Sequence, residues 1–186
     1  MQRYLGLAIA ALCAACAGSA IDGSSSGNTT YAGPFSGLYV ETTNSQGSNG
    51  GPPITCQNSY SLSGTLTMHV GLSGTTRTGT AQVTGTEAET GKSGDSTCPL
   101  KGNRTIDMTA QITGTNADLQ FTQQSSAGTT FATNNRATFS GTLATGVITG
   151  SLTWLRTGAG TSGTPGTSSA VSVQSTATVT MPVTLR

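Results

Sequence analysis

The one histidine of this chain, His69, is the side chain best suited to proton transfer near neutral pH. Nucleophilic catalysis by a serine would need this imidazole within hydrogen-bond reach of the hydroxyl, with a third group to orient the ring. His69 shares its register with Ser61, Ser63, Thr65 and Thr67 in an alternating segment, so we expect it to face solvent. The predicted strands also carry no Gly-x-Ser-x-Gly elbow of the kind found in many hydrolases. We therefore predict no catalytic residues and no enzyme activity.

Charged side chains that could hold a metal or an anion are scarce. Glu87 and Glu89 lie two residues apart on one segment, whereas paired glycosidase carboxylates come from separate elements about 5 to 9 Å apart. We interpret both as solvated residues at a strand end. Asp95 lacks the regular acidic spacing of a calcium loop. Four scattered arginines are expected to be individually solvated or to cap backbone: Arg77, Arg104, Arg136 and Arg156.

Composition excludes a further class of function. Charged residues make up 8% of the 186 residues and the formal net charge is +1, so the chain has no basic footprint for nucleic acid. The sequence predicts no nucleic-acid partner, no metal site and no cofactor.

The segments that would position any functional side chain alternate between apolar or glycine residues and Ser or Thr. The clearest is a hairpin from Phe139 to Leu155, in which Gly146 supplies the turn and Trp154 shares a face with Ile148 and Leu152. Further strands are predicted at Ser36–Thr43, Ser59–Gly71, Thr76–Glu87, Ile106–Thr113, Leu119–Phe121 and Val171–Leu185, with a short doubtful one at Thr129–Thr133 followed by a turn at Asn134-Asn135. Irregular loops are predicted at Asn44–Pro53, Thr90–Asn103 and Thr157–Ser169.

This pattern predicts a single all-β domain over residues 34–186. Eight or nine antiparallel strands must hide one shared apolar face, either in an up-and-down β-barrel or between the two sheets of a β-sandwich. Glycines at mid-strand on the apolar face, Gly64, Gly141 and Gly150, favour the barrel because they let strands bend sharply. Gly37-Leu-Tyr39 resembles the Gly-x-aromatic opening of lipocalin-like barrels, with tyrosine in place of the usual tryptophan.

The first residues follow the pattern of a signal peptide: a positive start at Arg3, an apolar run, then small residues. Ala14-Ala15-Cys16 resembles the cleavage and lipidation site of bacterial lipoproteins, although Cys13 stands where that pattern usually has an aliphatic residue. The resemblance implies a signal peptide over residues 1–15, a lipid on Cys16 that anchors the protein to a membrane, and, because Ala17 follows, the outer membrane. The alternative is a secreted soluble protein cleaved after Ala17 or Ala20. Residues 16–33, rich in Gly and Ser, are predicted to form a flexible tether.

Two cysteines remain once the N-terminal segment is set aside, Cys56 and Cys98. A pair in an oxidising compartment predicts one disulfide, and two buried free thiols are the alternative. Zinc binding is disfavoured because this pair lacks the close spacing of structural zinc sites and only one histidine is present.

These observations predict a non-catalytic envelope lipoprotein with a binding or surface-interaction role. One form of this role is a small apolar ligand inside the barrel, with a cavity lined by Trp154, Leu152, Ile148, Phe139, Leu66 and Met68. A second form is a structural or adhesive surface that acts through outward threonines such as Thr176, Thr178 and Thr180. A third is inhibition of a hydrolase through a projecting loop at Asn44–Pro53 or Thr90–Asn103. The sequence leaves open whether the barrel is hollow or solid.

Overall fold

The computed structural model describes residues 28–45, 52–96, 98, 100–127, 131–162 and 171–186. Strands account for nearly all of this part of the chain, and no helix is present in it. The strands are β1 (Thr29–Ser45), β2 (Ile54–Ser73), β3 (Thr76–Gly94), β4 (Arg104–Gly114), β5 (Leu119–Ala127), β6 (Phe131–Ala144), β7 (Val147–Ser162) and β8 (Val171–Leu185).

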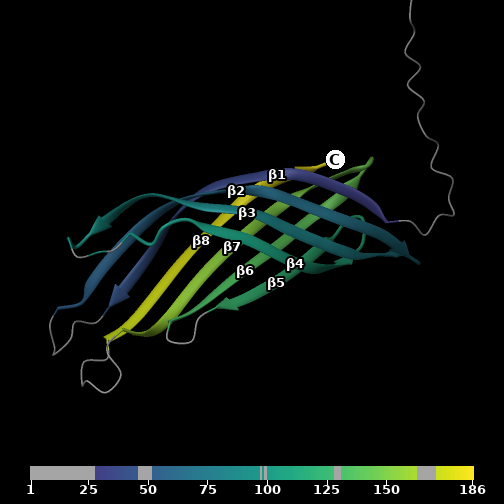
Figure 1. Cartoon of the computed structure of the whole chain (residues 1–186). Helices are drawn as coiled ribbons and strands as arrows, with labels where there is room; N and C mark the ends of the chain where they lie inside the picture. The colour runs from purple at the N-terminus through teal and green to yellow at the C-terminus, as the bar shows by residue number, and fades with distance from the viewer. Residues whose placement is uncertain (1–27, 46–51, 97, 99, 128–130, 163–170) are drawn as a thin grey trace, which may run out of the picture.

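The strands form a closed antiparallel barrel in which each pairs with its neighbour in sequence and β8 returns to β1 (Figure 1). Three connections at one end are short: Gly74-Thr75, Thr115–Asp118 and Thr145-Gly146. We call this end the turn end, and it also holds the start of β1 and Arg186. The opposite end, the loop end, carries the disulfide-bonded connection from β3 to β4. The up-and-down barrel predicted from the sequence is confirmed.

Alternation along the strands separates an apolar interior from a hydroxyl-rich exterior. On β4, for example, Ile106, Met108, Ala110 and Ile112 are buried while the residues between them are exposed. The predicted hairpin is also correct, since β6 and β7 pair with Phe139 opposite Leu152. Its two-residue turn places Thr145 and Gly146 at φ 48° and 75°, the left-handed region that such turns require.

Several strands are longer than predicted, because barrel strands are tilted and continue past the apolar core. β1 begins at Thr29, inside the predicted tether, and β7 continues to Ser162, inside a predicted loop. The stretch Thr90–Gly94, predicted as loop, belongs to β3: a bulge leaves Thr90 unpaired, and the ladder with β2 then resumes. Asn134-Asn135, predicted as a turn, lies within β6.

Inward glycines face one another in two cross-strand pairs, Gly64 with Gly85 and Gly141 with Gly150. A phenyl ring covers each pair, that of Phe35 over the first and that of Phe139 over the second, so a Cβ on any of these glycines except Gly85 would meet the ring as well as backbone. The sequence correctly placed Gly64, Gly141 and Gly150 on the inner face. The structure adds that they leave room for aromatic rings in a narrow barrel.

A side chain at Gly150 should therefore destabilise the barrel. Its Cβ would lie 2.7 Å from both the Gly141 Cα and the Phe139 ring, so we expect Gly150→Ala to lower the free energy of unfolding by about 1 to 3 kcal/mol. Gly91→Ala is the matched control, because a Cβ there has no atom within 4 Å. Urea unfolding of both variants measures the difference, and equal midpoints would contradict the proposed overpacking.

The ladders divide the barrel into two four-stranded halves. Within the half β1–β4, and within the half β5–β8, neighbouring strands pair over at least nine residues. Between the halves, β4 pairs with β5 only at Thr113–Gly114 with Leu119–Gln120. The fold is a closed barrel, but far fewer residues pair across the two seams between its halves than between neighbouring strands within each half.

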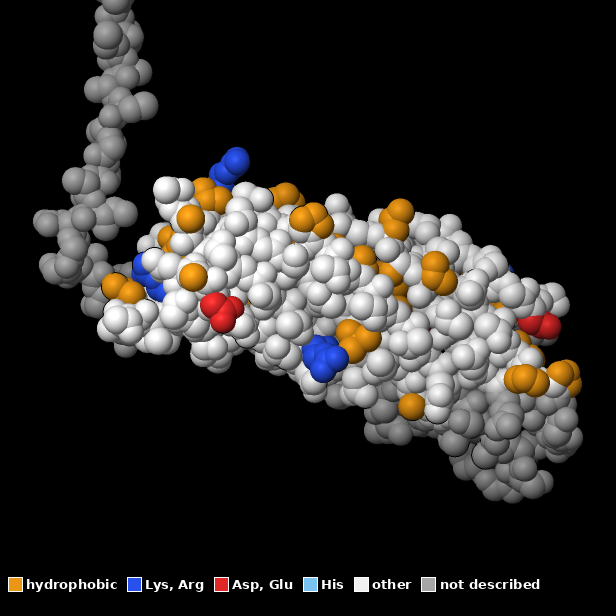
Figure 2. Space-filling view, turned by 180° about the vertical axis from the view of Figure 1, so that it is seen from behind, with side chains coloured by type: hydrophobic (Ala, Val, Ile, Leu, Met, Phe, Trp, Pro, Cys, Tyr) orange, Lys and Arg blue, Asp and Glu red, His pale blue; other side chains and the backbone are white. Residues whose placement is uncertain are grey.

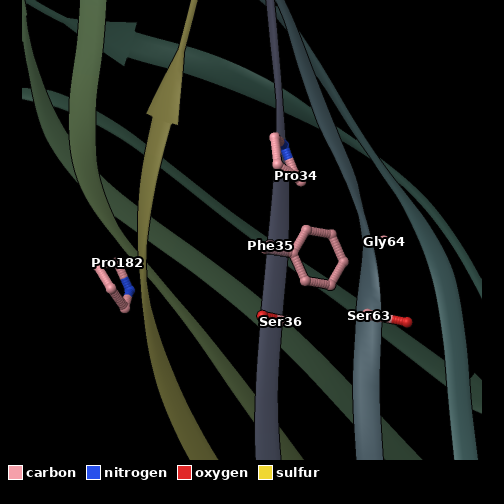
Figure 3. Close-up of a pocket in the computed structure, with 6 residues that line it drawn as sticks. All are labelled: Pro34, Phe35, Ser36, Ser63, Gly64 and Pro182. Atoms are coloured by element: carbon pink, nitrogen blue, oxygen red, sulfur yellow. The ribbon is translucent and has the colours of Figure 1, made fainter.

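The second seam, between β1 and β8, is paired at its two ends. Thr42–Ser45 pairs with Val173–Thr176, and Ala32 exchanges backbone hydrogen bonds of 3.0 and 3.1 Å with Arg186. Between these ends Pro34 and Pro182 occupy positions whose backbone nitrogens face the seam, and proline has no N–H to donate. A surface hollow of about 380 Å³ lies there, lined by Pro34, Phe35, Ser36, Ser63, Gly64 and Pro182 (Figure 3).

Candidate functional site

Charged residues occupy the inward positions closest to the loop end. Tyr39 and Glu41 continue the inward series of β1, and Glu87 continues that of β3. Arg104 at the start of β4 and Arg156 near the end of β7 complete the layer. We call this group the charge cluster; with the loop residue Lys101 and with Trp154 of β7 it comprises Tyr39, Glu41, Glu87, Lys101, Arg104, Trp154 and Arg156.

Two carboxylates and two guanidinium groups alternate in a closed ring. Glu41 Oε2 lies 3.2 Å from Arg104 Nη2, and Arg104 Nη1 lies 3.7 Å from Glu87 Oε2. Arg156 Nη1 lies 3.3 Å from Glu87 Oε2, and Arg156 Nε lies 3.6 Å from Glu41 Oε1. Lys101 Nζ adds a contact of 3.3 Å to Glu41 Oε1. Both carboxylates are buried, while the three cations keep 11 to 20% of their side-chain surface exposed.

Neutral donors satisfy the other oxygen of Glu87. The Tyr39 hydroxyl donates to Oε1 at 2.6 Å and the Trp154 indole N–H donates to the same atom at 2.8 Å. Tyr60 stacks on Tyr39 with ring centroids 5.1 Å apart, and the Arg104 guanidinium lies 4.5 Å above the Tyr60 ring. Such stacking is favourable for a partly desolvated arginine.

The cluster shifts the ionisation of its members. Burial opposes the charged form of Glu41, but Lys101 and Arg104 outweigh it and hold the pKa of this carboxyl below its ordinary value. Burial, together with the hydrogen bond to the Glu87 carboxylate, raises the pKa of the Tyr39 hydroxyl far above its usual range. Burial also lowers the pKa of Lys101, although Glu41 opposes that shift.

This arrangement can fasten strands together. Glu41 and Glu87 belong to the half β1–β4, whereas Arg156 and Trp154 belong to β7, so three of the contacts described above cross the barrel between its halves. Because the carboxylate oxygens are engaged and buried, the geometry favours a structural role for them over proton transfer.

The connection from β3 to β4, residues Asp95–Asn103, is held against the cluster. Cys98 forms the predicted disulfide with Cys56 of β2. The Glu89 carboxylate accepts hydrogen bonds from the backbone N–H groups of Lys101, at 2.8 Å, and Gly102, and Lys92 Nζ donates to the Cys98 carbonyl at 2.5 Å. Between these fixed points Leu100 projects outward with 68% of its surface exposed.

The structure corrects several sequence predictions. Glu87, expected to be solvated at a strand end, is 1% exposed. Arg104 and Arg156, each expected to be individually solvated or to cap backbone, meet in the cluster. Glu89, also expected to be solvated, is partly buried. The sequence offered one signal, since Glu87 and Glu89 continue the inward register of Ala81 and Val83. The expectation that residues at a strand end are solvated took precedence over this signal.

Other residues lie where the sequence predicted. His69 is exposed and its Nδ1 is 2.8 Å from the Thr30 hydroxyl oxygen, and Asp95 and Arg136 are also exposed. Thr176, Thr178 and Thr180 face outward from β8. Arg77 Nε donates to Asn116 Oδ1 at 2.6 Å at the turn end. The expected lipidation site, Cys16, lies outside the described residues.

The six residues expected to line a cavity all belong to the packed core. Trp154, Leu152, Ile148, Phe139, Leu66 and Met68 are all between 0 and 2% exposed. Side chains that lined an open space wide enough for a ligand would keep accessible surface, so these pack against their neighbours.

No protein-family model and no curated protein matches this chain. In the described part of the chain there is no helix long and apolar enough to cross a membrane. Nor do three or more His, Cys, Asp or Glu side chains gather there in a way that could hold a metal ion.

Removing one carboxylate should show how much the cluster contributes. Glu41→Gln leaves Lys101 and Arg104 without their buried partner, so we expect the free energy of unfolding at neutral pH to fall by about 3 to 5 kcal/mol. Urea unfolding followed by the fluorescence of Trp154, the only tryptophan, measures this loss. Asp107→Asn, an exposed carboxylate on β4, is the control and should have little effect.

Acid should weaken the same contacts. The pKa values of Glu41 and Glu89 lie below their ordinary value of 4.5, so the stability they contribute is complete above about pH 4.5 and is lost as the pH falls through their folded pKa values. We expect the wild-type free energy of unfolding to decrease over this range, and less steeply in Glu41→Gln. A slope unchanged by the substitution would contradict this assignment.

The disulfide should stabilise the domain substantially. It closes a loop with a sequence separation of 42, which the chain-entropy model values at about 4 kcal/mol. We expect the double substitution Cys56→Ala and Cys98→Ala to lower the free energy of unfolding by about this amount, measured in urea on a Cys16→Ala background. The same urea midpoint with and without reductant in the parent protein would contradict it.

Proposed function

We propose that this protein is a non-catalytic binding module of the bacterial envelope that contacts a protein partner through the loop end of a filled barrel. It is lipid-anchored through Cys16 at the outer membrane. A secreted soluble form without the lipid would use the same surface.

The placement of the chain ends supports this orientation. β1 starts at Thr29 at the turn end, so the segment that leads from Cys16 joins the barrel there. The loop Asp95–Asn103 lies at the opposite end, the end that a tethered barrel can present away from the membrane.

The filled interior supports a binding surface on the outside of the barrel. Leu66, Leu119 and Ile148 of the core are each 0% exposed, so a small apolar ligand would have to displace packed side chains. The described part of the face seen in Figure 2 is mostly uncharged and polar, with hydrophobic side chains scattered over it. Long-range charge attraction therefore contributes little to partner choice, and local shape has to supply it.

One observation carries the proposal: Leu100 is exposed between two points of its loop that are already fixed. Residues of this kind, apolar and held in place before binding, supply affinity because little conformational entropy is lost on association. The disulfide holds Cys98, and the hydrogen bonds from Lys101 and Gly102 to the Glu89 carboxylate hold the backbone that follows Leu100. The geometry fits insertion of Leu100 into an apolar pocket, as an inhibitor loop inserts into the substrate pocket of a hydrolase.

A pair of leucine variants tests this assignment. Leu100→Ser removes the proposed anchor, and Leu72→Ser removes a leucine of similar exposure, 58%, at the turn end. Full burial of a leucine contributes about 1.5 to 3 kcal/mol, so we expect Leu100→Ser to weaken partner binding by about tenfold or more. Leu72→Ser should bind like the wild type.

The measurement compares envelope proteins retained by the three immobilised proteins, quantified by mass spectrometry. A partner retained by the wild type and by Leu72→Ser but lost with Leu100→Ser supports the proposal. Retention that is equal for all three, or native mass spectrometry that finds one small apolar molecule bound per barrel, would contradict it.

A further inference from the structure

The seam between β4 and β5 leaves strand edges without ladder partners. Thr115 and Asp118 at the turn exchange backbone hydrogen bonds of 2.9 and 3.3 Å. Because hydrogen-bonded and non-hydrogen-bonded pairs alternate in an antiparallel ladder, every second residue of β5 counted from Asp118 directs its N–H and C=O groups into the seam. Pairing stops at Gln120, although β5 continues to Ala127. Beyond that point Thr122 and Gln124 of β5 direct their backbone groups into the seam, and the two strands diverge toward the loop end (Figure 1).

The edge of β5 carries none of the features that usually block strand pairing. Natural sheets protect free edges with charged residues, prolines or bulges. β5 has the sequence Leu-Gln-Phe-Thr-Gln-Gln-Ser-Ser-Ala, which contains no charge and no proline, and its register with β6 shows no shift. The seam between β1 and β8 differs, because Pro34 and Pro182 stand there.

Two local observations agree that this edge has no strand partner among the described residues. The Gln124 carbonyl accepts a hydrogen bond of 2.9 Å from the side chain of its own neighbour, Gln123. Beneath the seam, Ile106 and Met108 keep 5 and 6% of their surface exposed, whereas Leu119 at the closed part of the seam keeps none. The core is thus less completely covered where the ladder is missing.

We infer that the β5 edge binds an extended segment of a partner polypeptide, which adds as a strand beside Thr122 and Gln124. Backbone hydrogen bonds would give affinity, and alternate side chains would give specificity. The segment needs apolar side chains at every second position to cover Met108 and Phe121, and uncharged polar ones between them to lie beside Thr122. A second folded barrel fits poorly, because the β5 edge faces β4 across the seam and a thin, extended chain suits that space better.

This inference goes beyond the proposed function, since it concerns another surface and another kind of contact. The test uses the whole secreted chain with Cys16→Ala and, as a probe, a synthetic peptide with the β4 sequence Thr105–Gly114 in which Asp107→Asn makes every residue between the apolar ones uncharged. A scrambled peptide of the same composition is its control. Amide hydrogen exchange by NMR reports on the Thr122 and Gln124 N–H groups, which we expect to exchange rapidly in the free protein and at least about tenfold more slowly with the probe.

Two substitutions at one position separate the backbone from the side chain. Thr122→Pro removes only an N–H that faces the seam, which an edge strand tolerates, and should abolish protection of Gln124 by the probe. Thr122→Val keeps the N–H and should bind the probe like the wild type, and so should Leu100→Ser. Should Thr122→Pro not fold, Thr122→Lys places a charge on the same edge and should also block binding.

Three results would overturn the inference. In the first, the Thr122 and Gln124 amides of the free protein are as protected as those of β6, which has ladders on both sides. In the second, the scrambled peptide protects equally or Thr122→Pro still binds the probe. In the third, protection grows with protein concentration in the absence of peptide, which would show that a second copy occupies the edge.

Discussion

The ion pairs among Glu41, Glu87, Arg104 and Arg156 are the interaction on which the closed barrel depends most directly. The seams between the two halves have short ladders, so backbone hydrogen bonds alone join them weakly. Across the loop end, Arg156 and Trp154 of one half meet both carboxylates of the other. The apolar core holds the strands together in the middle of the barrel, and the charge cluster holds them together at the loop end.

A buried ion-pair ring costs desolvation, and an apolar layer of similar volume could be as stable. What the ring adds is register. Side chains alternate along a strand, so a slip of one residue in β3 would turn Glu87 outward and bring Thr86 or Ala88 into the interior beside two arginines. Such a slip would leave buried charges unpaired, which is far more costly than exchanging one apolar side chain for another. The cluster thereby penalises wrong registers in strands whose outer faces, uniform in Ser and Thr, do little to distinguish them.

Alternation in the sequence was sufficient to predict the all-β class, the β6–β7 hairpin and the inward glycines that favoured a barrel, because period-two patterns report directly on which face is buried. It could not predict the cluster. The alternating pattern can place Glu87, Arg104 and Arg156 on the inward face of their strands. Whether they meet depends on how eight tilted strands are staggered around the barrel, which no single strand encodes. The ends of β3 and β7 were missed for a related reason: polar residues such as Lys92 and Thr157 remain in ladders where the barrel wall extends beyond its apolar core.

The sequence left a barrel and a two-sheet sandwich as alternatives, and the ladders explain why the choice was close. Each half, β1–β4 and β5–β8, is a meander that could form one sheet of a sandwich. Closure depends on local features: the short turn between β4 and β5, and the pairing of Ala32 with Arg186 beside two prolines. Because the turn at Thr115–Asp118 holds only one end of its seam, the β5 edge remains free toward the loop end. Within the described residues, the same weak closure that made the fold hard to decide from sequence thus leaves the β5 edge, with no charge or proline, open to the strand addition that we infer.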